Sequence, residues 1–141
     1  MKEGAKLLCG GHQLKGGAYD EGFFVEPTVF GDVRPGMRIA QEEIFGPVLA
    51  IIPADDFEDA LEIANGVKYG LSASLCTSDF SRMVEYTQKM QAGTIMVNLP
   101  SAGVEYQIPF GGAKASSSGF REQGPVAVDF YTQLKTVYMK Y

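Results

Sequence analysis

The stretch PVLAIIPADDFEDALEIANG, residues 47–66, joins a continuous apolar run to a segment with helical periodicity. The run from Pro47 to Ala54 has the pattern of a strand that is buried on both faces. Asp55 or Asp56 can cap the helix that follows, and Asn65-Gly66 predicts a left-handed residue at its end. The stretch therefore predicts a β-strand followed directly by an α-helix.

The same alternation continues along the chain. The segment LSASLCT, residues 71–77, predicts a second strand, and Ser78 or Asp79 can cap a second helix that ends before Gly93. TIMVN, residues 94–98, predicts a third strand. Strands and helices that alternate with short connections indicate right-handed crossovers between parallel strands. We therefore predict the α/β class, with a largely parallel open sheet and flanking helices.

Further extended segments and one long loop surround this central part. KLLC (6–9) and FFVEPTVF (23–30) predict strands around a Gly-rich loop, and Pro27 restricts the second to an edge or short strand. Residues 99–124 are rich in Gly, Ser and Pro and too long for a plain connection, which is typical of functional loops. TQLKTVYMKY (132–141) alternates like a terminal edge strand, which favours pairing with another chain.

Composition narrows the function classes. The chain has 141 residues, of which 45% are hydrophobic, as expected of one domain with a buried core. Its formal net charge is -5 without a basic stripe, so nucleic acid and anionic membranes are poor candidate partners. No apolar stretch has the length of a membrane span, and the opening MKEGAKLL lacks the apolar stretch that a signal peptide would have. We therefore expect a cytoplasmic protein.

The reactive side chains exclude some kinds of site. Cys9 and Cys76 are isolated, and His12 is the single histidine, so the sequence predicts neither a metal site nor a disulfide framework. A Ser-His-Asp or Cys-His site would need His12, which lies in a Gly-rich loop. We expect Cys76 to be a small core residue within its strand.

Two carboxylates, Glu42 and Glu43, stand directly before IFGPVLAI. Paired carboxylates at a strand entrance are usually solvated surface charges. In an open parallel sheet, however, the ligand crevice lies at the strand ends, where a carboxylate can accept two hydrogen bonds from a vicinal diol such as a ribose. The ring of Phe45 could then pack against a flat ligand ring.

Six strings carry a family resemblance: FFVEPTVF, EEIFGPVLAI, YGLSASLCTSD, AGTIMVN, PFGGAKASSSG and FYTQLKTVY. In this order and at these separations they resemble the C-terminal part of NAD(P)-dependent aldehyde dehydrogenases, over essentially the whole chain. AGVEYQIPFGGAKASSSGFREQG is most similar to the branch that oxidises 2-oxoglutarate semialdehyde (2,5-dioxovalerate). The resemblance implies the rear part of the catalytic domain in residues 1–131 and the family's oligomerisation strand, hence a homo-oligomer, in residues 132–141.

The resemblance also implies roles for five residues. Glu43 would accept hydrogen bonds from the nicotinamide ribose, and Phe45 would pack beside the nicotinamide of NAD or NADP. Ser101, in the substrate-anchoring loop, and Phe110 would line the aldehyde pocket. Glu122 is similar to a family glutamate near the active site, although SSSGFREQG has one residue more than the common SGxGRExG pattern.

The family's cysteine nucleophile, glutamate base and oxyanion asparagine lie upstream of the EEIFGPV string. The resemblance therefore implies no catalytic residue in this chain and no activity of the chain alone. Three interpretations remain: a fragment or severed domain of an enzyme, a natural truncated homologue that docks on full-length subunits, and an independent nucleotide-binding module. The first is favoured because the chain begins midway through what resembles a family strand.

Overall fold

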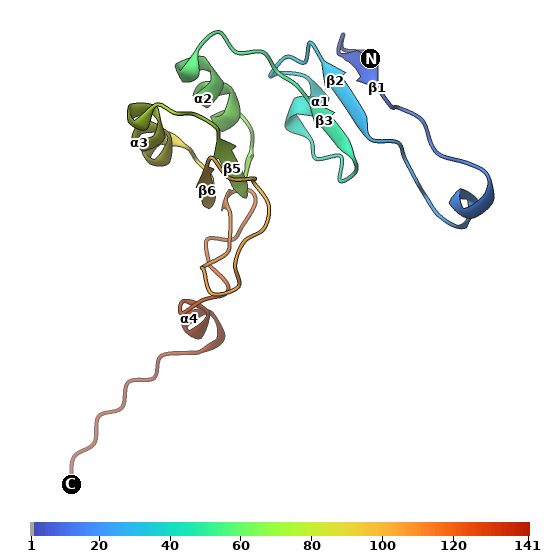
Figure 1. Cartoon of the computed structure of the whole chain (residues 1–141). Coiled ribbons are helices and arrows are strands. Elements are labelled where there is room, and N and C mark those ends of the chain that lie inside the picture. The colour runs from blue at the N-terminus through green and yellow to red at the C-terminus, as the bar shows by residue number, and fades with distance from the viewer. Residues whose placement is uncertain (1) are drawn as a thin grey trace. The chain divides into compact units, whose positions relative to one another are not determined.

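The computed structural model describes residues 2–141, and the chain divides into two compact units, Met1–Val67 and Lys68–Tyr141. Helices separate most of its strands along the chain (Figure 1). This confirms the predicted α/β class, but the described strands form three small sheets instead of one open sheet. Across the described residues, no helix combines the length and apolar character needed to cross a bilayer.

The sheet of the first unit has the order β1-β2-β3, from β1 (Lys6–Cys9), β2 (Thr28–Gly31) and β3 (Val48–Ala50). β2 runs antiparallel to β1 and parallel to β3. Because Pro27 has no N–H for a ladder bond, β2 starts directly after it and is short, as predicted. It nevertheless occupies the centre of this sheet, whereas an edge position was the predicted alternative.

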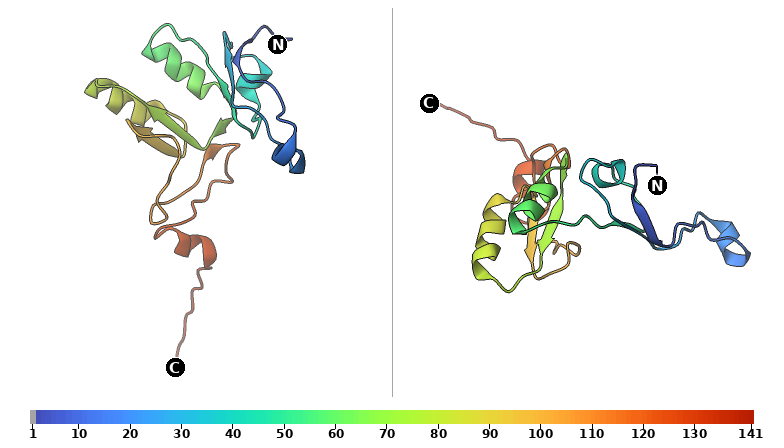
Figure 2. Two further views of the ribbon diagram at one scale, coloured as in Figure 1. Left: turned by 45° about the vertical axis from the view of Figure 1, so that its right-hand side comes forward. Right: turned by 90° about the horizontal axis from the view of Figure 1, so that it is seen from above.

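Between β1 and β2 the chain makes an excursion that carries the 3-10 helix η1 (Gly17–Glu21) at its far end (Figure 1, Figure 2). An isolated antiparallel bridge between Gln13 and Val25 holds its two arms together. The excursion is therefore a long hairpin arm that extends from the sheet.

A small core supports the first unit. Its buried members are Ala5, Val33 and Met37, and partly buried apolar residues pack against them: Phe30, Ile39, Ala40, Ala50 and Ile52. The prediction that 47–54 is buried on both faces is wrong for this chain, because Leu49 and Ile51 are 57% and 46% exposed. Successive strand residues point to opposite faces, and the core covers only one of them.

Two helices follow sheet strands in the first unit. The short α1 (Arg38–Gln41) begins directly after the buried Met37. α2 (Phe57–Asn65) starts as predicted, because the Asp56 carboxylate accepts the Asp59 N–H at 2.8 Å. The predicted left-handed end is wrong: Gly66 has φ −73° and instead donates its N–H back into the last turn.

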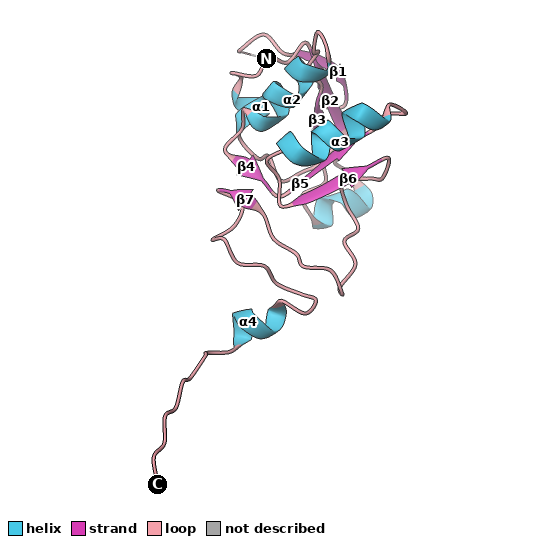
Figure 3. Ribbon diagram, turned by 90° about the vertical axis from the view of Figure 1, so that its left-hand side faces the viewer, coloured by secondary structure: helices cyan, strands magenta, loops and turns pink. Residues whose placement is uncertain are grey.

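The second unit contains the predicted strand-helix-strand motif. β5 (Ser72–Leu75) pairs in parallel with β6 (Thr94–Val97), and α3 (Phe80–Lys89) connects them and lies against one face of the pair (Figure 2, Figure 3). The Asp79 carboxylate caps α3 by accepting two backbone N–H groups at 2.9 and 3.2 Å. This cap was one of the two predicted from the sequence.

The second unit contains one further pair of strands. β4 (Tyr69–Gly70) runs antiparallel to β7 (Ala113–Lys114). The segment before β7 crosses close to Gly93, where an added Cβ would lie 1.9 Å from the Gly111 carbonyl oxygen. The helix was predicted to end before Gly93, and α3 ends at Lys89; the glycine itself permits this close approach.

The chain ends with α4 (Ala127–Tyr131) and the tail, residues 132–141, which leaves α4 without further helix or strand (Figure 1). Leu134 and Tyr138 in the tail are 99% and 93% exposed. The predicted terminal strand requires a pairing partner, and none is formed with the described residues of this chain. Its assignment as an oligomerisation strand stays a prediction.

Candidate functional site

The two adjacent glutamates lie where α1 ends. They border a cavity of about 320 Å³, whose lining is Ile39, Glu42, Glu43, Ile44, Phe45, Gly46, Val48 and Ala50. The structure thus brings the predicted pair Glu43 and Phe45 to one cavity. Within residues 2–141, the Glu43 side chain forms no hydrogen bond and no ion pair, so its carboxylate oxygens can accept bonds from a ligand.

Phe45 combines two unfavourable features. Its φ of 56° lies in the left-handed region, which costs a residue with a Cβ about 1–2 kcal/mol, and its side chain is 92% exposed. Hydrogen bonds hold the turn around it: the Val48 N–H donates to Gly46 at 2.7 Å, and the Thr28 N–H donates to Pro47 at 2.8 Å. A strained backbone that presents an apolar ring to a cavity indicates a binding role.

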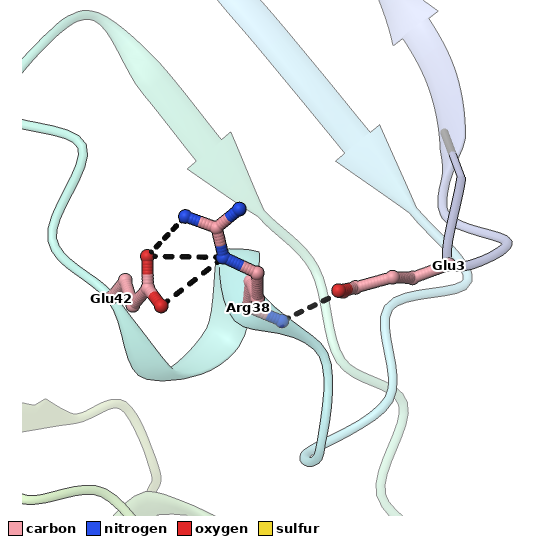
Figure 4. Close-up of polar contacts among 3 residues, drawn as sticks. All are labelled: Glu3, Arg38 and Glu42. Atoms are coloured by element: carbon pink, nitrogen blue, oxygen red, sulfur yellow. Dashed lines mark hydrogen bonds and ion pairs between the residues drawn. The ribbon is translucent and has the colours of Figure 1, made fainter.

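Glu42 differs from its neighbour because it is paired. The Arg38 guanidinium donates to its carboxylate, with Nη2 at 2.7 Å and Nε at 3.1 Å (Figure 4). The hydrogen bond to Glu42 raises the pKa of Arg38 above its ordinary value, and the negative charge of Glu42 adds to this effect. The cavity is therefore bordered by one neutralised and one unpaired carboxylate.

In the second unit, Asn98 ends the β5–β6 pair. Its side chain accepts the Thr77 N–H and donates to the Thr77 carbonyl, both at 2.9 Å, so it continues the ladder by one step. Its φ of 57° is a conformation that asparagine tolerates, in contrast to the aromatic Phe45. Asn98 therefore fixes the point from which the loop of residues 99–108, the predicted substrate-anchoring loop, departs.

That loop is held by hydroxyl groups of β5. Ser72 donates to the Ser101 carbonyl at 2.9 Å, and Ser74 donates to the Leu99 carbonyl. The two serines are two residues apart and thus on the same face of the strand. Between β6 and the loop lies a cavity of about 420 Å³, which is lined by ten residues from Thr94 to Ile108, but not by Ser101 or Phe110.

Phe110 and Glu122 lie opposite each other in an isolated antiparallel bridge. The Phe110 N–H donates to Glu122 at 2.6 Å, and the Glu122 N–H donates to Phe110 at 2.8 Å. Arg121 donates to the Gly112 carbonyl at 2.8 Å and so ties the two segments together. The structure thus brings two predicted site residues together, each through its backbone; Phe110 is half-buried and Glu122 is exposed.

The Arg38–Glu42 ion pair was not predicted from the sequence, although its i,i+4 spacing in a helix is typical of such pairs. The prediction of a core position for Cys76 is wrong, because β5 ends at Leu75 and the exposed thiol follows in the turn toward α3. Cys9 is exposed as well. Among the described residues, no cluster of His, Cys, Asp or Glu is suited to hold a metal ion.

Comparisons with known proteins give a consistent result. The model of the aldehyde dehydrogenase family matches residues 1–137. An alpha-ketoglutaric semialdehyde dehydrogenase from Bacillus subtilis is 53% identical over 139 residues, which are 99% of this chain and 28% of that protein. An alpha-ketoglutarate semialdehyde dehydrogenase from Haloferax volcanii is 52% identical over 140 residues, or 99% and 29%. The chain thus spans less than a third of these relatives.

Solved structures agree with the sequence relatives. A variant of the indole-3-acetaldehyde dehydrogenase of P. syringae, in complex with NAD+, superposes with a TM-score of 0.89 at 41% sequence identity. The match covers 99% of this chain and 28% of the P. syringae chain. A Mycobacterium tuberculosis aldehyde dehydrogenase complexed with NAD+ has a TM-score of 0.84 at 46% identity, with 99% and 29% covered. Because the family model matches nearly the whole sequence and the folds agree, this chain belongs to the aldehyde dehydrogenase family.

Proposed function

We propose that the chain forms the part of an NAD(P)-dependent aldehyde dehydrogenase that holds the nicotinamide ribose and one wall of the aldehyde pocket. The complete enzyme would oxidise an aldehyde to its acid. The observation that carries the proposal is the unpaired Glu43 carboxylate beside the strained and exposed Phe45, both at one cavity. Two relatives of similar fold were solved with NAD+.

The residues at this cavity fit the cofactor. The Glu43 carboxylate has the acceptor capacity to bind both hydroxyls of a ribose diol, and the Phe45 ring offers a flat apolar surface to the nicotinamide. When bound, the nicotinamide supplies the acceptor for a hydride. Together Glu43 and Phe45 would orient the ring and shield one of its sides from water. A contact with the nicotinamide would explain why Phe45 keeps an exposed ring on a left-handed backbone.

For the substrate we propose 2-oxoglutarate semialdehyde. The support is the identity of 53% and 52% to two relatives that are named for this substrate. Ser101 and Phe110 would border the aldehyde pocket, and Glu122, bridged to Phe110, would support its wall.

A chimeric enzyme tests the proposal. In this chimera, residues 1–141 replace the matching segment of the Bacillus subtilis relative. We expect the chimera to reduce NAD or NADP with 2-oxoglutarate semialdehyde, and the 141-residue chain alone to be inactive because it lacks the family's nucleophile and base. Cofactor absorbance at matched concentrations is the measurement. A folded but inactive chimera, or turnover by the purified chain, would contradict the proposal.

A second candidate function is that of an interaction partner that docks on full-length subunits without catalysis. The observation that favours it is the tail, in which Leu134, Tyr138 and Met139 are 99%, 93% and 88% exposed. Such a segment has backbone groups and apolar side chains available for strand pairing. Homo-oligomerisation of the complete enzyme through the same residues would use the same chemistry, and we propose it as the role of the tail in that enzyme.

A further inference from the structure

Two neighbouring carboxylates border the proposed cofactor cavity, yet only one of them is unpaired. A dinucleotide cofactor is itself an anion, so a second free carboxylate beside it would repel it at a distance of a few ångströms. Arg38, the first residue of α1, forms an ion pair with Glu42 and thereby neutralises the charge that would repel the cofactor.

The geometry of the pair is specific. Arg38 Nε lies 3.1 and 3.2 Å from the two Glu42 carboxylate oxygens, and Nη2 lies 2.7 Å from one of them (Figure 4). The Arg38 backbone is fixed as well, because its N–H donates to the Glu3 carboxylate at 2.7 Å. Glu3 is in turn held by Arg34, which donates to its carbonyl at 3.0 Å. Arg38 is thus held at two points: its backbone N–H by Glu3 and its guanidinium by Glu42.

Stability alone does not account for this arrangement. Arg38 and Glu42 are 77% and 53% exposed, and exposed ion pairs typically contribute about 0–1 kcal/mol. Their order along the chain also opposes the helix dipole, because the cation stands at the start of α1 and the anion at its end. A pair selected for helix stability would have the opposite order.

The backbone connects the pair to Glu43. Glu42 has φ −115° and ψ 135°, an extended conformation in which the next side chain points to the opposite side. The Cβ atoms of Glu42 and Glu43 therefore leave the backbone on opposite sides, and the ion pair holds only the Glu42 side chain. We propose that Arg38 is a positioning residue, which neutralises Glu42 and so presents Glu43 as the single ribose-binding carboxylate of the cavity. This inference rests on the proposed function of Glu43.

The experiment uses the chimeric enzyme and a double-mutant cycle of Arg38→Gln and Glu42→Gln, with Arg38→Lys as the conservative variant. We expect Arg38→Gln to raise both the dissociation constant of the cofactor, titrated without aldehyde, and its KM about three- to fivefold, the effect of losing an exposed pair, while the KM for the aldehyde stays unchanged. Arg38→Lys keeps the charge and should stay within about twofold. The double variant should recover a cofactor KM close to that of the parent, because glutamine at position 42 carries no charge for Arg38 to neutralise.

Two controls separate the possible failures. Arg82→Gln removes an arginine from a comparable exposed pair, with Asp79, and should leave the cofactor KM unchanged. Melting temperatures identify variants that merely unfold. An unchanged cofactor KM in Arg38→Gln, or effects of the two substitutions that multiply, overturns the inference while the role of Glu43 stands. If Glu43→Gln also leaves cofactor binding unchanged, the proposed function fails, and the inference fails with it.

Discussion

At the residue scale, Phe45 shows how a costly conformation can indicate function. Its ring is exposed and its backbone is left-handed, whereas Asn98, with a similar φ, belongs to a residue type that tolerates it and makes two hydrogen bonds. The sequence placed Phe45 beside a ligand by resemblance, but it gave no sign of the strain, because φ depends on how the turn closes against β2. The paired state of Glu42 likewise appears only once α1 is formed.

Phe45→Gly and Phe45→Ala separate strain from binding. Both variants remove the ring, so we expect both to weaken cofactor binding by the chimeric enzyme. Glycine also relieves the left-handed conformation, whereas alanine keeps a Cβ, so the glycine variant should be more stable by about 1 kcal/mol. Thermal unfolding and cofactor titration measure the two effects. Equal stability of the two variants would show that the strain is absent, and unchanged titrations would exclude the ring contact.

At the scale of the elements, local signals predicted where α2 and α3 begin, but not α1, α4 or the pairing of the strands into sheets. Asp56 and Asp79 cap α2 and α3 as predicted, because an N-cap depends on residues within one turn. The parallel β5–β6 pair was also predicted from one short crossover. The division into three small sheets was not, since the pairing of β4 with β7 joins segments that are more than forty residues apart. Periodicity along the chain does not encode such contacts.

Gly93→Ala tests the crossing of two segments in the second unit. An added Cβ would lie 1.9 Å from the Gly111 carbonyl oxygen and 2.7 Å from Gly112 Cα. Because both neighbours are backbone, the PFGG segment must move, and we expect a loss of about 1–3 kcal/mol in the free energy of unfolding. Gly36→Ala is the matched control, since an added Cβ there has no neighbour within 4 Å. Thermal unfolding that is equally affected in both variants would contradict this account of the crossing.

At the scale of the whole molecule, the tail is the segment whose role depends on a second chain. We expect the 141-residue chain to self-associate through residues 132–141, because pairing satisfies the backbone groups and buries side chains such as Leu134 and Tyr138. Sedimentation over a range of concentrations compares the intact chain with one that ends at Phe130. A monomeric intact chain, or a shortened chain that associates equally well, would exclude this interface.

The central claim is that Glu43 binds the nicotinamide ribose, and the dissociation constant of the cofactor tests it most directly. In the chimeric enzyme, Glu43→Gln removes one charged acceptor, which should cost about 1.5 to 3 kcal/mol, or roughly a 10- to 150-fold loss of affinity. Glu62→Gln, at an exposed position of α2, is the matched control and should bind the cofactor like the parent. If Glu43→Gln binds as tightly as Glu62→Gln and transfers hydride at the same rate, the assignment is wrong.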